Sequence, residues 1–268
     1  MDTLAQKKQR LEEILRELGS AAVAFSSGVD STFLLRTAHD VLGDKALAVT
    51  VSMHSCPQRE LDEAVLFCRE NKIRHLLIEH NELSVEGFTQ NPPERCYICK
   101  KAIFERIRTA AQEQGLAYVL EGSNLDDDGD YRPGLRAIAE LGIRSPLREA
   151  GLTKADIRAL SKELGLPTWD KPSYACLATR FPYGELITAE GLSMVGQAEQ
   201  MLFELGIRQS RVRVHGKTAR IEVQKSDFEK VISKAGEINL FFSELGFLYT
   251  ALDLGGYKTG NLNKTIHF

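Results

Sequence analysis

The sequence predicts an α/β protein with a parallel sheet, followed by a smaller α+β domain. Short apolar segments alternate with helical segments through the first two thirds of the chain, and a hairpin pattern between helices follows residue 180. Strands separated by helices indicate βαβ units and therefore a parallel sheet. We expect one domain over residues 1–180 and a second over residues 181–268.

The elements of the first domain follow from apolar periodicity and from helix start and stop signals. Residues 1–19 are amphipathic, with leucines near one face of a helix. Thr153 is a suitable N-cap with Asp156 three residues later, and Gly165 and Pro167 end that helix. The strands are expected at 20–25, 46–51, 74–79 and 117–121, and further helices at 32–41, 57–71, 98–114 and 153–164.

The second domain has a different pattern. Residues 170–184 are rich in proline, small residues and aromatics, which is typical of an ordered loop at a domain boundary. Beyond them, residues 211–215 and 219–223 alternate around the turn HGKT like a β-hairpin. Helices are expected at 188–204, 226–235 and 237–244, and a last strand at 247–252.

Composition limits the function classes. The chain has 268 residues, of which 43% are hydrophobic and 26% charged, with a net charge of −3. This charge disfavours a nucleic-acid partner, because phosphate contacts usually require a basic excess. The N-terminus does not resemble a signal peptide, and no apolar run reaches the roughly 20 residues of a membrane span. We expect a soluble, cytoplasmic protein without membrane partners.

Ser26-Ser27-Gly28-Val29-Asp30-Ser31 directly follows the first strand and opens a helix. Small residues let backbone N–H groups approach phosphate oxygens, and the N-terminus of a helix favours anions. Asp30 suits a role in holding Mg²⁺ or in ordering the loop. An ordinary capped turn is the alternative, and the Walker pattern is absent because no Lys-Ser or Lys-Thr closes the loop.

This segment resembles the SGGxDS signature of the PP-loop ATP pyrophosphatases, which cleave ATP between its α and β phosphates. Ser27 replaces the first glycine of the signature, and a serine would be strained if the position needs positive φ. The resemblance implies that the loop holds the pyrophosphate of ATP, that backbone near residues 50–52 receives adenine, and that Gly122 lies against the nucleotide. The implied nucleotide-binding residues are Ser26, Ser27, Gly28, Asp30, Ser31, Thr50 and Gly122.

Five cysteines in a chain without an export signal disfavour a disulfide framework. Cys96 and Cys99 form a CxxC pair before a helix, and Cys176 lies in the proline-rich loop. Thiolates are ligands for zinc and iron–sulfur clusters. The alternative for the CxxC pair is two thiols without a metal or catalytic role. The alternative for Cys176 is a small buried residue. Cys68 falls on the apolar face of a helix, and Cys56 is unassigned.

Residues 121–184, with the PP-loop and the RVRVH and ALDLGG segments, resemble the LarE-like sulfur transferases of nickel-pincer nucleotide synthesis. One kind of LarE-like protein gives up the sulfur of a single cysteine. The other kind has CxxC plus the loop cysteine and is thought to carry sulfur on a [4Fe–4S] cluster. The three-cysteine pattern here matches the second kind, with Cys96, Cys99 and Cys176 as metal ligands and Cys176 and Asp30 as catalytic residues.

Arg211, Arg213 and His215 alternate on one expected strand and should share a face. Paired guanidiniums form a receptor for phosphate or carboxylate, whereas a solvated strand face is the alternative. In LarE-like proteins the matching arginines are thought to hold the substrate phosphate. Arg180 could join that site, Glu199 and Glu222 match acidic positions associated with it, and Asp126–Asp128 form either a cation site or a polar loop.

The expected function is ATP-dependent sulfur transfer, with ATP, Mg²⁺ and a [4Fe–4S] cluster as cofactors. The resemblance implies the substrate pyridinium-3,5-biscarboxylic acid mononucleotide and a homo-oligomer, and it leaves the sulfide donor unknown. Sacrificial donation from Cys176, a tRNA-thiolating enzyme and a nucleotide-binding iron–sulfur sensor without enzymatic activity remain alternatives. An amide-forming synthetase is disfavoured, because the chain has no room for a glutaminase domain.

Overall fold

The computed structural model describes residues 2–127, 133–172, 174–258 and 260–262. The chain divides into two compact units. The first comprises residues 1–81 and 96–174, and the second comprises residues 82–95 and 175–268. These units are groups of segments that pack together, and each unit contains two separate stretches of the chain. The expected division into two domains at residue 180 therefore stays a prediction.

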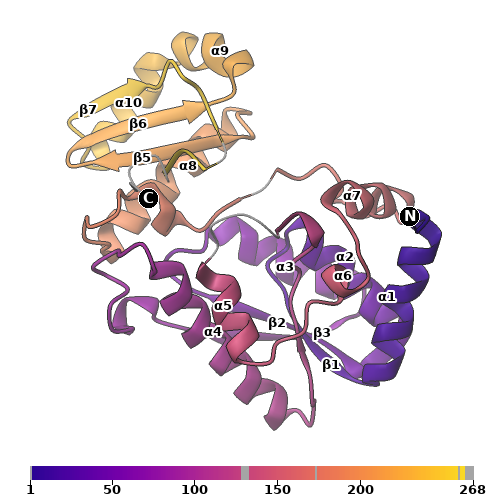
Figure 1. Cartoon of the computed structure of the whole chain (residues 1–268). Coiled ribbons are helices and arrows are strands. Elements are labelled where there is room, and N and C mark those ends of the chain that lie inside the picture. The colour runs from indigo at the N-terminus through magenta and orange to yellow at the C-terminus, as the bar shows by residue number, and fades with distance from the viewer. Residues whose placement is uncertain (1, 128–132, 173, 259, 263–268) are drawn as a thin grey trace. The chain divides into compact units, whose positions relative to one another are not determined.

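The first unit alternates helices and strands, as the sequence predicts (Figure 1). Its α7 helix begins with the expected capping box, in which Thr153 and Asp156 bond each other's backbone N–H groups. Its helices and strands are α1 (Leu4–Leu18), β1 (Ala21–Ala24), α2 (Val29–Leu42), β2 (Ala46–Ser52), α3 (Gln58–Glu70), β3 (Arg74–Glu79), α4 (Arg95–Glu113), β4 (Val119–Leu120), α5 (Pro133–Glu140), α6 (Pro146–Glu149) and α7 (Lys154–Glu163).

The four strands form a parallel sheet in the order β3-β2-β1-β4. The chain runs outward from β1 to β3 on one side and then returns to the other side of β1 with β4. The strand order therefore reverses between β1 and β4. In open parallel sheets, such a switch point opens a crevice beyond the carboxyl ends of the strands. The segments that follow β1 and β4 lie at this switch point.

Both faces of the sheet are covered by helices. Ala21 and Val23 of β1 belong to one core cluster with residues of α1, α2, α3 and α7. Ala22 of the same strand belongs to another cluster, with residues of α4 and α5. This alternation follows from the period of two along a strand. Packing on both faces holds β1 in place and so fixes the direction in which the chain leaves β1 at the switch point.

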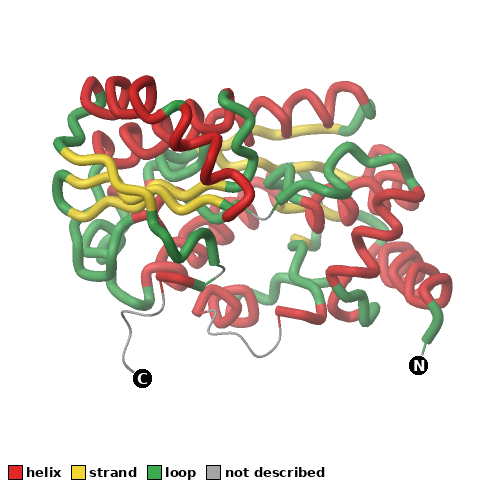
Figure 2. The backbone as a smooth tube through the Cα atoms, turned by 90° about the horizontal axis from the view of Figure 1, so that it is seen from above, coloured by secondary structure: helices red, strands yellow, loops and turns green. Residues whose placement is uncertain are grey.

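The second unit is built on a three-stranded sheet, seen as yellow strands flanked by red helices in Figure 2. β5 and β6 are the expected antiparallel hairpin, and β7 pairs with β6 in parallel. Residues of α8, α9 and α10 pack on this sheet in one core cluster. The elements are α8 (Ala189–Glu204), β5 (Ser210–His215), β6 (Thr218–Val223), α9 (Phe228–Ser233), α10 (Ala235–Glu244) and β7 (Tyr249–Leu252).

The second unit also includes residues 82–95, which precede it by a long stretch of chain. Asn91 donates hydrogen bonds to the carbonyls of Phe181 (3.2 Å) and Pro182 (2.7 Å). The Arg95 guanidinium donates to the carbonyl of Ala178 (3.1 Å). The segment immediately before the CxxC pair is therefore bonded to the turn that follows Cys176.

Two short helices, α5 and α6, do not emerge from the sequence. Helices of this length are marginal alone and depend on tertiary packing, so their periodicity is a weak signal. β4 is also shorter than the expected 117–121 strand. No helix in the described ranges has both the length and the apolar character of a membrane span.

Candidate functional site

The loop after β1 is closed by its own side chains. Ser31 Oγ lies 3.2 Å from Ser26 Oγ and donates to the carbonyl of Gly28 at 3.3 Å. It also accepts from the Ser26 N–H at 3.4 Å. Gly28 is the N-cap of α2, so the loop leads directly into the N-terminus of this helix. These features provide the N–H donors and the dipole that an anion requires.

Ser27 adopts a left-handed backbone conformation, with φ of +52°. This is the position where the signature has glycine, and a side chain there is strained. The Ser27 hydroxyl donates to the Glu60 carbonyl (3.0 Å) and to Glu60 Oε2 (3.3 Å). Ser27 is almost fully buried. The hydroxyl therefore attaches the loop to α3, which a glycine could not do.

Gly122 follows β4 and lies against the loop across the switch point. A Cβ atom at this position would approach Ser31 N to 3.1 Å and Asp30 Cβ to 3.3 Å. The close approach favours glycine and brings the segment after β4 to the start of α2. The structure thus gathers Ser26, Gly28, Asp30, Ser31 and Gly122 at the switch point.

Asp30 lies in the first turn of α2 and contacts two side chains from the part of the chain that follows β4. Lys154 Nζ forms an ion pair with Asp30 Oδ2, and Asn124 Nδ2 lies 3.4 Å from Oδ1. Both Asp30 and Lys154 are partly exposed. A carboxylate in this place, beside an anion-binding loop, can hold a cation and order the loop.

The acidic segment after Gly122 has structural partners. Asp126 Oδ2 accepts from the Lys154 N–H at 2.8 Å, and Asp127 Oδ2 accepts from the Asn124 N–H at 2.9 Å. These contacts support the polar-loop alternative for both residues. Asp128 lies outside the described residues.

Thr50 lies near the end of β2, and its side chain is buried. Its hydroxyl donates to the Phe25 carbonyl at 2.9 Å and contacts His75 Nε2 at 2.9 Å. Burial lowers the pKa of His75 and so favours the neutral ring. Because the Thr50 side chain is engaged in these bonds, a role in adenine binding would fall to the backbone, and it stays a prediction.

Cys96 and Cys99 lie in the first turns of α4, and both side chains are partly exposed. Residues three apart share one face of a helix. Tyr97 between them is held by α5, because its hydroxyl donates to Glu140 (2.7 Å) and the Arg136 guanidinium lies 3.8 Å from its ring centroid. The start of α4 is thereby fixed to α5.

Cys176 is the N-cap of a short 3₁₀ turn, Leu177–Arg180, in the second unit. Its carbonyl accepts from Thr179 N (3.0 Å) and Thr179 Oγ1 (2.9 Å), while the thiol side chain is partly exposed. Arg180 Nη1 adds a bond to the same carbonyl at 3.3 Å. The backbone of Cys176 is thus held by hydrogen bonds from the residues that follow it.

All five cysteines lie in the described part of the chain, and none forms a disulfide. Cys68 belongs to the core, as its helical position predicts, and burial raises the pKa of its thiol to about 12. Within the described ranges, no three or more His, Cys, Asp and Glu side chains are gathered as a metal site. Cys96 and Cys99 belong to the first unit and Cys176 to the second.

Arg180, Arg211 and Arg213 are nearly fully buried, so the solvated strand face considered for Arg211 and Arg213 is wrong. Arg180 forms a two-point ion pair with Glu199 at 2.6 and 2.8 Å. Arg213 pairs with Glu222 at 3.0 and 3.2 Å. The structure therefore brings Glu199 and Glu222 to the arginines as their counter-ions. His215, at the end of the strand, is exposed.

The surroundings favour the charged form of Glu199 but disfavour the charged form of Arg211. Burial would raise the pKa of Glu199, but the charge and hydrogen bonds of Arg180 outweigh it, and the pKa lies below its usual value. Burial and the like charge of Arg180 both lower the pKa of Arg211. An anion bound at Arg211 would relieve the second of these effects.

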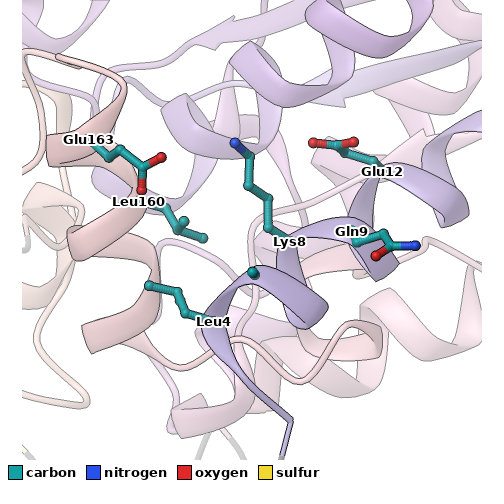
Figure 3. Close-up of a pocket in the computed structure, with 7 residues that line it drawn as sticks. Leu4, Lys8, Gln9, Glu12, Leu160 and Glu163 are labelled. Atoms are coloured by element: carbon teal, nitrogen blue, oxygen red, sulfur yellow. The ribbon is translucent and has the colours of Figure 1, made fainter.

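A depression between α1 and α7 has a volume of about 390 Å³ (Figure 3). Its lining residues are Leu4, Ala5, Lys8, Gln9, Glu12, Leu160 and Glu163. None of them is a predicted site residue, so this depression is separate from the crevice at the switch point.

Comparisons with known proteins identify the family. The chain is 39% identical to the pyridinium-3,5-bisthiocarboxylic acid mononucleotide synthase of Lactiplantibacillus plantarum, over 99% of this chain and 97% of the relative. The chain belongs to the LarE family. It is also 42% identical to an uncharacterized protein of Synechocystis, over 98% and 99% of the two chains. No protein-family model matches the chain.

The LarE family is related to the glutamine-hydrolyzing GMP synthases. The chain is 30% identical to one component of the GMP synthase of Thermoplasma acidophilum, over 74% of this chain and 67% of the relative. The resemblance to LarE-like proteins, the PP-loop α/β fold and the expectation of an enzyme are confirmed. The roles of the individual residues stay predictions.

Three further polar residues at the loop are not singled out by the sequence. Lys154 and Asn124 contact Asp30, and Lys171 donates to the Ser27 carbonyl at 3.0 Å. A single lysine carries no pattern of its own. The only local signal is position, since Lys154 follows the N-cap of α7 and Lys171 precedes a proline in the ordered loop.

Proposed function

We propose that this protein uses ATP to activate the carboxylates of pyridinium-3,5-biscarboxylic acid mononucleotide and converts them to thiocarboxylates. The observation that carries the proposal is the loop Ser26–Ser31 at the switch point, in a chain so similar to a named bisthiocarboxylate mononucleotide synthase. The loop offers N–H donors at a helix N-terminus, and Gly122 packs closely against its backbone.

In the first step, a substrate carboxylate oxygen attacks the α-phosphorus of ATP and pyrophosphate leaves. The loop donors bind the leaving pyrophosphate, whose negative charge increases as the bond breaks. Asp30 would hold Mg²⁺, which neutralises phosphate charge when bound. The product is an acyl-adenylate, whose AMP group leaves far more readily than oxide.

In the second step, hydrosulfide attacks the acyl carbon, AMP departs and a thiocarboxylate forms. Cys96, Cys99 and Cys176 would hold a [4Fe–4S] cluster, which supplies an iron site open to hydrosulfide when bound. The donor set suits iron, because all three thiols are partly exposed, whereas the buried Cys68 keeps its proton.

A hydrogen bond within the second unit joins Arg95 to the turn that follows Cys176. Arg95 directly precedes Cys96, and Ala178 lies two residues after Cys176. Their hydrogen bond therefore connects the backbone segments that carry two of the three cysteines. The arginine cluster of the second unit would receive the phosphate of the mononucleotide, through the buried guanidiniums of Arg180, Arg211 and Arg213.

The adenylation step is tested by product analysis. We expect pyrophosphate, without equivalent orthophosphate, to appear only when the biscarboxylate substrate is present. Asp30→Asn should abolish this release, whereas Asp40→Asn on the exposed face of the same helix should not. Release of orthophosphate alone, or pyrophosphate release indifferent to the substrate, would refute the proposal.

The cluster is tested separately. Anaerobically purified protein should contain iron and acid-labile sulfide, and Cys99→Ala should lose both, whereas Cys56→Ala should retain them. Folded wild-type protein without iron would remove the cluster and leave adenylation standing. Turned-over protein lighter by one H₂S at Cys176 would instead establish sacrificial sulfur donation.

A further inference from the structure

The nucleotide loop of this chain contains a feature that its signature does not explain. Ser27 occupies a left-handed backbone conformation that glycine adopts freely and serine does not. A strained residue persists only where its surroundings hold it in place. The contacts of Ser27 therefore identify the groups that keep the loop in its binding conformation.

Those contacts come from two other segments of the first unit. Lys171 Nζ donates to the Ser27 carbonyl at 3.0 Å and to Glu60 Oε2 at 2.9 Å. Glu60 in turn accepts from the Ser27 hydroxyl. Both the carbonyl and the side chain of Ser27 are thus bound, one by a cation and the other by the carboxylate that pairs with that cation.

Lys171 is placed firmly for this contact. The backbone carbonyls of Trp169 and Lys171 accept from Arg158 of α7 at 2.7 and 2.8 Å. The Lys171 side chain is only 11% exposed, and Glu60 only 9%. A second carboxylate, Glu63, lies 2.5 Å from Lys171 Nζ. This is a largely desolvated ion pair, so losing one partner costs far more than losing a surface pair.

The carbonyl contact also determines the direction of the next N–H. In a trans peptide the C=O and N–H bonds point to opposite sides. When the Ser27 carbonyl faces Lys171, the N–H of Gly28 points away from Lys171. Gly28 is the N-cap of α2, where N–H groups serve anions.

We propose that Lys171 is a positioning residue that, through the Ser27 carbonyl and Glu60, holds the loop in the conformation that binds pyrophosphate. The proposal rests on the proposed function, since it concerns the same loop. It assigns Lys171 no contact with the nucleotide. Its effect on ATP should therefore pass entirely through the backbone of Ser27 and Gly28.

The experiment measures pyrophosphate binding by calorimetry in wild type and in Lys171→Met. The dissociation constant for pyrophosphate should rise about tenfold. The free energy needed to hold one non-glycine residue in the left-handed conformation corresponds to about that factor in a binding constant. KM for ATP should rise by a similar factor while kcat changes less, since the loop binds the phosphates before and during reaction. Lys7→Met, which loses a partly buried ion pair with Asp156 of α7, is the matched control and should bind as wild type does.

The decisive comparison uses Ser27→Gly as a second background. Glycine needs no support at positive φ, so Lys171→Met should change pyrophosphate binding less than about twofold in that background. An equal loss in both backgrounds would overturn the proposal, because it would mean that Lys171 attracts the phosphates directly. Unchanged binding in Lys171→Met alone would overturn it as well.

Folding is controlled by thermal unfolding of each variant. If Lys171→Met leaves Glu60 uncompensated and does not fold, the charge-neutral double variant Glu60→Gln with Lys171→Met takes its place in both backgrounds. Failure of the proposed function looks different from failure of this inference. In the first case, folded wild-type protein itself would not bind pyrophosphate.

Discussion

The buried pair of Arg180 and Glu199 allows a stability prediction of defined size. Glu199→Gln keeps the shape of the side chain but removes the charge that Arg180 faces at 2.6 and 2.8 Å. The Arg180 side chain is 1% exposed and that of Glu199 13%. Removing one partner of such a pair leaves an uncompensated buried charge, which costs about 3–5 kcal/mol.

Urea unfolding followed by circular dichroism measures this loss. With a urea dependence of about 1–3 kcal/mol/M, a loss of about 3 kcal/mol moves the midpoint of the second unit by about 1–3 M. The single tryptophan, Trp169, lies in the first unit, and its fluorescence reports on that unit independently. Glu12→Gln removes an exposed helical pair with Arg16 and should cost less than about 0.5 kcal/mol.

The pH dependence follows from the sign of the shift. The pKa of Glu199 is lowered in the folded protein, so its stabilisation is complete above the unfolded value of about 4.3. That stabilisation is lost as the pH falls through the folded pKa. The difference between wild type and Glu199→Gln should therefore shrink in acid. A loss below about 1 kcal/mol at neutral pH, or a difference unchanged in acid, would refute the buried ion pair.

Further expectations concern Gly122 beside the nucleotide loop, an exposed position of α10 and the buried thiol of Cys68. Gly122→Ala should raise KM for ATP about tenfold in the pyrophosphate-release assay, because its methyl group would meet the backbone of Ser31 at 3.1 Å; an unchanged KM would place the nucleotide elsewhere. Gly236→Ala, where nothing lies within 4 Å of the added methyl group, should instead stabilise α10 by up to about 1 kcal/mol, measured by thermal unfolding; a loss of stability would contradict this open position. Cys68 should resist alkylation in the folded protein at neutral pH, because burial raises the pKa of its thiol to about 12. Mass mapping measures the modification of each cysteine. Modification of Cys68 as fast as Cys176 would contradict its placement in the core.

The elements that the sequence predicts well are those whose signal is local. The capping box at Thr153 and the short apolar runs of the parallel strands each depend on residues within a few positions of one another. The nucleotide loop is local too, because its serines and Gly28 are contiguous. Residues 82–95 show the limit, since they join the second unit through bonds to residues about 90 positions away. No pattern within the segment reveals those partners.

The same limit applies to the lysines at the loop. Lys171 and Ser27 are separated by 144 positions, and Lys154 and Asp30 by 124. Their contacts depend on the tertiary fold, because no local pattern brings together residues so far apart in the sequence. The departure at Ser27 was visible in the sequence, but the groups that hold it there were not. Chain geometry, rather than residue type, decides which lysine contacts the loop.

The sequence leaves the roles of Glu199 and Glu222 open, and the hydrogen bonds of the two carboxylates limit which roles are possible. Glu222 accepts from Arg213 at Oε2 and from Arg220 and Asn261 at Oε1. A carboxylate offers about four acceptor positions, and these contacts occupy them all. A metal ligand would need those positions free. Glu222 therefore fixes the guanidinium of Arg213, and Glu199 does the same for Arg180, while a role of either carboxylate at a substrate site stays a prediction.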